Sequence, residues 1–230
     1  MTAAEIQKFA DALPKLRVLV VGDLMLDRYL WGNVSRISPE APVPIVDIEK
    51  SESRPGGAAN VALNVSKLGA QVSLCGIIGE DDNGVLLIDR LQQRGFDHSL
   101  VFKNADRVTT TKTRIIGNNQ QILRVDQELR DELGTKLSEE ILSKLLPRLN
   151  EFDAIIFEDY DKGFLNPALI AGLIKAANAA NIPTVVDPKF GNFMAYEGVT
   201  LFKPNLKELN EALNLRIKNG DIAGIQSAVA

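Results

Sequence analysis

Two glycines and an asparagine stand at the start of a helix-like segment, in the stretch Arg-Pro-Gly-Gly-Ala-Ala-Asn of residues 54–60. Glycine weakens a helix from inside, but just before a helix it lets a ligand approach the backbone closely. A helix start also presents free backbone N–H groups. The amide of Asn60, in the first turn, can donate to or accept from a hydroxyl. We therefore expect Gly56, Gly57 and Asn60 to bind a polyol, although a tight turn explains a lone glycine pair equally well.

Polar residues collect where four apolar, strand-like segments end. The segments are residues 17–21, 154–157, 183–187 and 200–202, and the polar residues are Asp23, Asp27, Glu158, Asp159, Tyr160, Asp161, Lys162, Asp187, Lys189, Lys203 and Asn205. In open α/β sheets, ligands bind at the edge formed by the carboxyl ends of the strands. A single acidic residue could be a helix cap, but four polar clusters on one edge predict a binding site.

The elements that must position these residues alternate in type along the chain. Apolar runs at 17–21, 72–78, 154–157, 183–187 and 200–202 are typical of strands, and helical periodicity is found at 58–68, 85–91, 138–149, 167–180 and 206–213. Apolar strands that alternate with helices indicate an α/β fold with a mostly parallel sheet covered by helices on both faces. No linker-like segment divides residues 1–230, so we expect them to lie in one domain.

Two segments, residues 29–53 and 100–125, break this alternation. The first contains three prolines in SPEAPVP and has no helical period. The second contains TTTKTRII and QILRV on either side of Gly-Asn-Asn, which predicts a hairpin. We expect both segments to form a small β lid that stands off the main sheet, because long insertions in compact domains often cover a site. An ordinary surface hairpin is the alternative.

Composition excludes several functional classes. The 230 residues are 45% hydrophobic with a net charge of −4, which gives no electrostatic footprint for nucleic acid or an anionic membrane. No run of about 20 apolar residues could span a membrane, and residues 1–16 do not resemble a signal peptide. A chain with one cysteine cannot form a disulfide framework, which fits the reducing cytoplasm in which we expect this protein. The single cysteine, Cys75, and the single histidine, His98, make a disulfide framework or a histidine-based catalytic site a poor interpretation.

The glycines that follow residue 57 carry a family resemblance. The stretch GGAANVA, followed by glycines at 69 and 79, resembles the N-terminal signature of the ribokinase-like, or phosphofructokinase-B, carbohydrate kinases. The resemblance implies a ribokinase-like fold and ATP as the phosphate donor. It also implies that sugar hydroxyls are bound by Gly56, Gly57, Asn60 and Asp27, the aspartate after the first strand.

A second motif, KPNLKEL at residues 203–209, resembles the family's Asn-x-x-Glu motif through Asn205 and Glu208. Residues at this spacing share a helix face, so the amide and carboxylate could organise Mg²⁺ through water beside nucleotide phosphates, the role that the family assigns to them. Lys203 would lie near the same phosphates, and Lys189 could face either the nucleotide or a substrate phosphate. A solvated helix with a cap explains such a string when it stands alone.

Within that family, residues 16–213 resemble the heptose-7-phosphate kinases. The resemblance rests on the sequences of residues 22–46, 54–62, 118–128, 159–163 and 186–189. It implies ATP-dependent phosphorylation of D-glycero-β-D-manno-heptose 7-phosphate at C1, towards ADP-heptose and lipopolysaccharide. It also implies an adenylyltransferase, fused or separate, and makes a homodimer plausible in which lid strands pair between subunits and cover open sheet edges.

A phosphorylated substrate requires cations in the site. Arg114 and Arg124 flank the Gly-Asn-Asn turn on strands that could pair, and guanidinium groups bind phosphate in a bidentate manner. We therefore expect Arg114 and Arg124 to bind the substrate phosphate, with Asp159 and Lys162 as the next substrate ligands. Each arginine could instead form only salt bridges within the lid.

The family's C-terminal motif, of the type Asp-Thr-x-Gly-Ala-Gly-Asp, is absent from the 230 residues. Its final aspartate is the family's catalytic base, so we assign no catalytic residue and expect that base beyond Ala230. Because phosphoryl transfer depends on positioning and charge neutralisation, we expect little kinase activity from this chain alone. It would be either the N-terminal portion of a longer ribokinase-like domain or a naturally truncated relative.

Other functions compete with this interpretation. Another ribokinase-like sugar or nucleoside kinase would leave the phosphate-handling arginines unexplained. A non-catalytic module that binds sugar phosphate would fit the missing base. A dinucleotide-dependent oxidoreductase is disfavoured because GDLMLD, after the first strand, does not match Gly-x-Gly-x-x-Gly.

Overall fold

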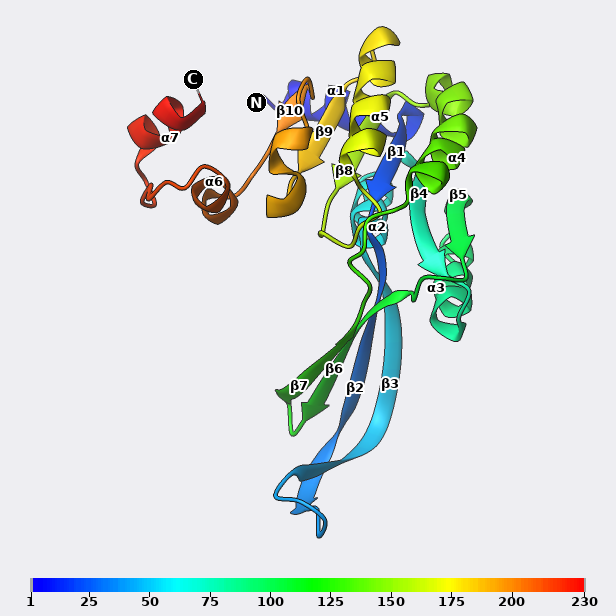
Figure 1. The fold of residues 1–230 in the computed structure, drawn as a ribbon, viewed down its shortest axis with the longest axis vertical. Coiled ribbons are helices and arrows are strands. Elements are labelled where there is room, and N and C mark those ends of the chain that lie inside the picture. The colour runs from blue at the N-terminus through cyan, green and yellow to red at the C-terminus, as the bar shows by residue number, and fades with distance from the viewer. Residues whose placement is uncertain (1, 230) are drawn as a thin grey trace.

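The computed structural model describes residues 2–229 and places their strands in two sheets (Figure 1). The main sheet, in spatial order, consists of β10 (Leu201–Phe202), β9 (Thr184–Asp187), β8 (Ala154–Glu158), β1 (Arg17–Gly22), β4 (Gln71–Gly79) and β5 (Asp97–Asn104). The projecting sheet consists of β3 (Pro44–Gly57), β2 (Leu24–Ile37), β6 (Thr110–Gly117) and β7 (Gln120–Gln127). The helices are α1 (Ala3–Ala12), α2 (Ala58–Lys67), α3 (Asp82–Gln92), α4 (Thr135–Leu145), α5 (Pro167–Ala179), α6 (Leu206–Ala212) and α7 (Ile222–Val229), with 3₁₀ helices at Leu13–Lys15, Leu146–Glu151 and Phe190–Ala195.

The main sheet is parallel throughout and buried on both faces. Leu19 and Val21 of β1 pack with α4 and α5 in one core, whereas Val18 and Val20 pack with α2 and α3 in the other. Successive side chains point to opposite faces of a strand, so an apolar run needs a core on each side. These two helical layers around a parallel sheet confirm the predicted α/β fold.

The order of strands in the main sheet defines where a ligand site should lie. β1 occupies the middle of the sheet, and the chain first adds β4 and β5 on one side of it. It then returns to add β8, β9 and β10 on the other side. In open α/β sheets, a crevice forms at the carboxyl ends of the strands where the order reverses, which here are the ends of β1 and β8.

The projecting sheet grows directly out of the main sheet, because only Asp23 separates β1 from β2. β3 and β6 flank β2 in antiparallel and parallel register, and β7 pairs antiparallel with β6. In Figure 1 these strands extend away from the helices and the main sheet. The boundaries differ from the prediction: residues 100–104 belong to β5 of the main sheet, so the second segment of the projecting sheet begins at Thr110.

Helix ends follow the local chemistry of the sequence. The side chain of Asn166 accepts the N–H of Leu169 at 2.9 Å, and Pro167 occupies the first position of α5. Pro147 follows the end of α4, so the predicted helix at 138–149 finishes as a 3₁₀ helix. Among residues 2–229, we find no helix with the length and hydrophobicity that a membrane span requires.

Candidate functional site

Asp23 joins the carboxyl ends of β1 and β8 to the start of α2. Its backbone N–H donates to the carbonyl of Glu158 at 3.1 Å, and its carbonyl accepts the N–H of Ala58 at 3.0 Å. The residue is 3% exposed, and its carboxylate accepts the backbone N–H groups of Tyr160 at 2.8 Å and Lys162 at 3.2 Å. Burial raises the pKa of Asp23 to about 6 in spite of these hydrogen bonds.

Gly56 and Gly57 bring the backbone of β3 close to two aspartates just before α2. Gly57 has φ 56° and ψ −134°, a conformation that residues with a Cβ rarely adopt. A Cβ on Gly57 would meet the carbonyl of Asp23, and one on Gly56 would meet the carboxylate of Asp27. Close packing therefore requires both glycines. Asn60 lies exposed in the first turn of α2, where a ligand can reach its amide.

Asp27 and Arg114 form an ion pair at the base of the projecting sheet, with Nη1 2.6 Å from Oδ1. Arg114 lies opposite Tyr29 of β2 and opposite Arg124 of β7, so the two predicted arginines share a face of the sheet. The side chain of Arg124 is 50% exposed and contacts Asp126 at 2.9 Å. The structure therefore brings the arginines together, with each guanidinium beside a carboxylate.

Arg54 adds a third guanidinium to this face, and the sequence analysis did not single it out. It lies opposite Asp27 in the β2–β3 register and contacts Glu52. The guanidinium carbons of Arg54 and Arg114 each lie 5.2 Å from the ring centre of Tyr29. The alternation of residues along β3 is the signal that could have placed Arg54 on this face.

The loop at residues 159–163, after β8, carries the other predicted substrate ligands. Asp159 is 1% exposed, and its carboxylate accepts the hydroxyl of Tyr196 at 2.7 Å and the amide of Asn192 at 3.0 Å. Burial raises its pKa. Asp159 therefore braces the loop from inside, in contrast to the predicted contact with substrate. Lys162 directs its ammonium to Glu128, with Nζ 2.9 Å from Oε2.

The predicted nucleotide-binding residues lie near the carboxyl ends of β9 and β10. Lys203 Nζ is 2.9 Å from a carboxylate oxygen of Asp187, and Lys189 contacts Glu208. Asn205 accepts the N–H of Glu208 at 2.9 Å, and Glu208 accepts the N–H of Asn205 at 2.8 Å. This reciprocal arrangement is a capping box at the start of α6, which is the alternative that the sequence left open.

The surroundings of Glu208 limit how it could take part in Mg²⁺ binding. The residue is 6% exposed, and its two oxygens contact the N–H of Asn205 and the ammonium of Lys189. Among the described residues, 2–229, no group of three or more His, Cys, Asp or Glu is arranged to hold a metal ion. Because both oxygens of Glu208 are engaged, the residues present would suit Mg²⁺ through water and nucleotide phosphates rather than by direct coordination.

Glu158 ends β8, which lies between β1 and β9, and Tyr160 follows it, so both residues lie between the predicted substrate-binding and nucleotide-binding residues. Glu158 is 8% exposed and pairs in register with Asp187 on the neighbouring strand. Burial, followed by the charge of Asp187, raises the pKa of Glu158 to about 7. The ring centre of Tyr160 lies 5.8 Å from Nζ of Lys189. Burial and the neighbouring carboxylates also raise the pKa of Tyr160.

Arg107, in the connection between β5 and β6, is a further residue that the sequence analysis missed. It donates to backbone carbonyls of the loop after β8 and of the connection between β7 and α4. A side chain whose acceptors are distant carbonyls leaves no spacing pattern in the sequence. Asp23, by contrast, belongs to the polar clusters after the strands, and that position was its signal.

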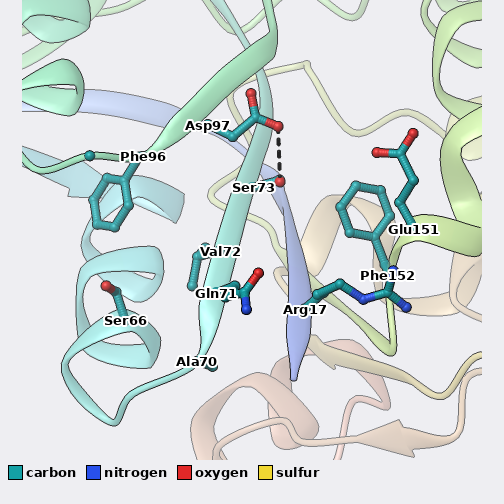
Figure 2. Close-up of a pocket in the computed structure, with 11 residues that line it drawn as sticks. Arg17, Ser66, Ala70, Gln71, Val72, Ser73, Phe96, Asp97, Glu151 and Phe152 are labelled. Carbon is teal, nitrogen blue, oxygen red and sulfur yellow. Dashed lines mark hydrogen bonds between the residues drawn. The ribbon is translucent and has the colours of Figure 1, made fainter. Parts of the chain in front are cut away.

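A separate pocket opens where β1, β4 and β5 of the main sheet begin (Figure 2). Its volume is about 530 Å³, and Arg17, Gln71 and Asp97, the first residues of β1, β4 and β5, contribute to its lining. The hydroxyl of Ser73 donates a hydrogen bond to the carboxylate of Asp97 at 3.1 Å, and a dashed line marks it in Figure 2. The polar residues after the strands lie at the other end of these strands, so this pocket is not part of the candidate site.

Residues 15–230 match the family described as pfkB family carbohydrate kinase. The chain belongs to the pfkB family. This assignment agrees with the buried start of α2 and with the clustering of polar groups after β1, β8, β9 and β10. It confirms the carbohydrate kinase family that the sequence resembled.

The pfkB-family chain is similar to curated proteins named bifunctional protein HldE. It is 45% identical over 204 residues to the protein from Geobacter metallireducens, with 89% of this chain and 42% of that protein covered. It is 43% identical over 201 residues to the protein from Helicobacter pylori strain J99, with 87% and 43% covered. The chain thus spans less than half the length of these relatives.

Solved structures of pfkB-type kinases share the fold. Phosphofructokinase-2 from Escherichia coli, in its tetrameric inhibited form, gives a TM-score of 0.69 at 19% identity, with 93% of this chain and 68% of that chain covered. The ribokinase from Arabidopsis thaliana, complexed with ribose and ATP, gives 0.65 at 17% identity, with 93% and 67% covered. These similarities confirm a ribokinase-like fold.

Proposed function

We propose that this pfkB-family chain forms the sugar-phosphate-binding part of a kinase. Asp27 and Asn60, beside Gly56 and Gly57, would bind sugar hydroxyls, and the substrate phosphate would be bound by Arg114, Arg124 and Lys162. The ion pair of Asp27 with Arg114 at 2.6 Å supports this proposal most directly. A carboxylate accepts from hydroxyls and a guanidinium donates to phosphate, so a ligand that carries both groups fits this face.

We infer that the substrate is D-glycero-β-D-manno-heptose 7-phosphate, phosphorylated at C1 with ATP. The resemblance of residues 16–213 to the heptose-7-phosphate kinases supports this substrate, and so does the similarity to the bifunctional HldE proteins. The product would be converted to ADP-heptose for lipopolysaccharide in the cytoplasm. The word "bifunctional" in the relatives' name fits an adenylyltransferase fused to the kinase, although a separate enzyme would serve equally well.

The nucleotide would lie beside β9 and β10 in this proposal. Lys189 and Lys203 would face the phosphates of ATP, and both lysines now contact carboxylates that a nucleotide would have to displace or share. Asn205 and Glu208 would orient water around Mg²⁺. The capping box keeps both side chains fixed at the start of α6, which supports an indirect role better than direct coordination.

The projecting sheet would act as a lid over the sugar and as a dimer contact. Leu123 and Val125 of its edge strand β7 are 52% and 49% exposed, and a second copy of the chain could cover them. We also propose that this chain alone does not transfer phosphate. Its 230 residues contain no Asp-Thr-x-Gly-Ala-Gly-Asp motif, so the family's catalytic base and anion-binding glycines are missing.

Calorimetric titration tests the proposed substrate. The chain should bind heptose 7-phosphate, bind the unphosphorylated heptose more weakly, and bind ATP weakly or not at all. Binding of a different sugar phosphate in preference would favour another pfkB sugar kinase. Binding of sugar phosphate with no turnover after the missing motif is supplied in a longer chain would favour a non-catalytic binding module. No sugar binding by a folded sample would contradict the proposal.

Asn60→Leu tests the sugar-hydroxyl contact, and Asn64→Leu is the matched control. Both residues are exposed on α2, and Asn64 lies one turn further from the glycines. Asn60→Leu should abolish heptose binding while Asn64→Leu keeps it. Equal affinities for the two variants would show that Asn60 does not contact the sugar.

A further inference from the structure

Arg107 lies in the crossing from β5 of the main sheet to β6 of the projecting sheet. Its side chain is half-buried and donates to backbone carbonyls from two other parts of the chain. Nη2 lies 2.6 Å from the carbonyl oxygen of Lys162, and Nη1 lies 2.9 Å from that of Asp131. A longer contact, 3.5 Å, joins Nη2 to the carbonyl of Leu129. The planar, forked guanidinium suits several acceptors at once.

The acceptors of Arg107 belong to the segments that must stay in place around the candidate site. Leu129 and Asp131 lie in the return connection from β7 to α4, and Lys162 lies in the loop after β8. Arg107 itself lies in the outgoing connection. The guanidinium of Arg107 therefore links two connections, the one from β5 to β6 and the one from β7 to α4. It also fastens both of them to the loop that carries Lys162.

The peptide and side chain of Lys162 are held from three directions. Its N–H donates to the carboxylate of Asp23 at 3.2 Å, and its carbonyl accepts from Arg107 at 2.6 Å. Its ammonium lies 2.9 Å from Glu128, which in turn lies 3.6 Å from Nζ of Lys112 in β6. Asp23 thus holds Lys162 to the main sheet, whereas Arg107 and Glu128 hold it to the base of the projecting sheet.

The return connection also packs directly on this loop. The N–H of Leu133 donates to the carbonyl of Gly163 at 3.0 Å. Gly163 has φ 81°, and a Cβ there would meet the backbone of Asp131. The loop and the return connection are therefore in direct contact, so we expect a shift of one segment to move the other.

We propose that Arg107 is a positioning residue, which fixes Lys162 to the base of the projecting sheet so that Lys162 and Arg114 face the same substrate phosphate. This inference rests on the proposed function, in which Lys162 binds that phosphate. Arg107 does not itself contact the sugar phosphate. It determines where the Lys162 ammonium is held, and it fixes the position of the projecting sheet relative to the loop.

A double-mutant cycle on the full chain tests this role by calorimetry with heptose 7-phosphate. If Arg107 acts through Lys162, Arg107→Met should weaken binding about tenfold and add little loss to Lys162→Met. The unphosphorylated heptose should bind to the wild type and to Arg107→Met with equal affinity. Arg94→Met, at an exposed arginine just after α3 that donates to the carbonyl of Arg90, should bind like the wild type. Independent losses that multiply, or an unchanged Arg107→Met, would overturn the proposal.

Hydrogen exchange tests, without a ligand, whether Arg107 holds the loop after β8 and the return connection together. Arg107→Met should speed exchange at residues 160–164 and 129–133 together and leave the core strand β4 unchanged. Arg107→Lys keeps the charge but not the fork, so it should restore these effects only in part. If the wild type binds no heptose 7-phosphate, the proposed function fails. Separately, unchanged exchange in Arg107→Met and Arg107→Lys would show that Arg107 does not hold these two segments together.

Discussion

Arg114 donates to Asp27 at 2.6 Å, from a strand of the projecting sheet to the strand that continues β1. The two side chains are 24% and 21% exposed, so solvent and ligands can still reach them. A sugar hydroxyl that takes Asp27 as its acceptor must therefore share it with a guanidinium. Recognition of a hydroxyl and of a phosphate would be coupled through this contact, because the arginine proposed to bind the phosphate also donates to the carboxylate proposed to accept the hydroxyl.

Arg114→Met should weaken the binding of heptose 7-phosphate by about 10–100-fold, since a hydrogen bond to a charged group contributes roughly 1.5–3 kcal/mol. Arg124→Met should have a smaller effect because its side chain is 50% exposed and already contacts Asp126. Calorimetric titration measures both, with Arg94→Met as the control for loss of charge. Affinity within about twofold of the wild type would remove Arg114 from the site.

Gly57→Ala should lower the free energy of unfolding by about 3 kcal/mol, because backbone strain and a clash with the carbonyl of Asp23 act together. Gly95→Ala is the matched control: its φ is 71°, but a Cβ there would meet nothing within 4 Å. It should cost only about 1 kcal/mol, from strain alone. Urea unfolding distinguishes the two, and equal losses would mean that close packing at Gly57 is unimportant.

The main sheet could be predicted from the sequence because most of its strands are short apolar runs between helices. β5 shows where this reasoning fails. Of Asp97–Asn104, only Leu100 is buried, so this edge strand has little apolar signal and merges with the insertion that follows. The site edge was predictable for a related reason: polar residues directly after a parallel strand must lie on one side of the sheet.

The contacts of the individual site residues could not be predicted. The partners of Asp159, Asn192 and Tyr196, lie 33 and 37 positions away in sequence, and nothing local shows that they point at its carboxylate. A buried brace and an exposed ligand use the same residue type. Asn205 and Glu208 present a similar ambiguity, because their spacing is that of a capping box as well as that of the family motif.

Lys189→Met should destabilise the fold more than Lys203→Met. Lys189 contacts Glu208, which is 6% exposed, so its removal leaves a buried carboxylate without a cation, at a cost of about 2 kcal/mol. The side chain of Lys203 is 61% exposed, and its pair with Asp187 should contribute less than about 1 kcal/mol. Urea unfolding of both variants measures the difference. A larger loss of unfolding free energy for Lys203→Met would contradict the idea that the Lys189 pair matters more because Glu208 is buried.

Glu158 should make the fold less stable as the pH rises through the neutral range. Burial raises the pKa of Glu158 from 4.5 to about 7. Between these values the folded chain keeps a proton that the unfolded chain has released, so the free energy of unfolding falls with increasing pH. The loss is complete only about one pH unit above the folded pKa, where both states are ionised.

Glu158→Gln replaces the titrating carboxyl by a neutral amide, so the variant should gain stability relative to the wild type as the pH rises. Over the range from about pH 5 to about pH 8, this gain should grow by about 2–3 kcal/mol, as measured by urea unfolding. Glu140→Gln is the control, because Lys144 lowers the pKa of this exposed carboxyl. Glu140 is mostly ionised in both states over that range, so its variant should show little such growth. A difference for Glu158→Gln that stays constant with pH would mean that its carboxyl is already ionised at about pH 5 and is better solvated than its burial indicates.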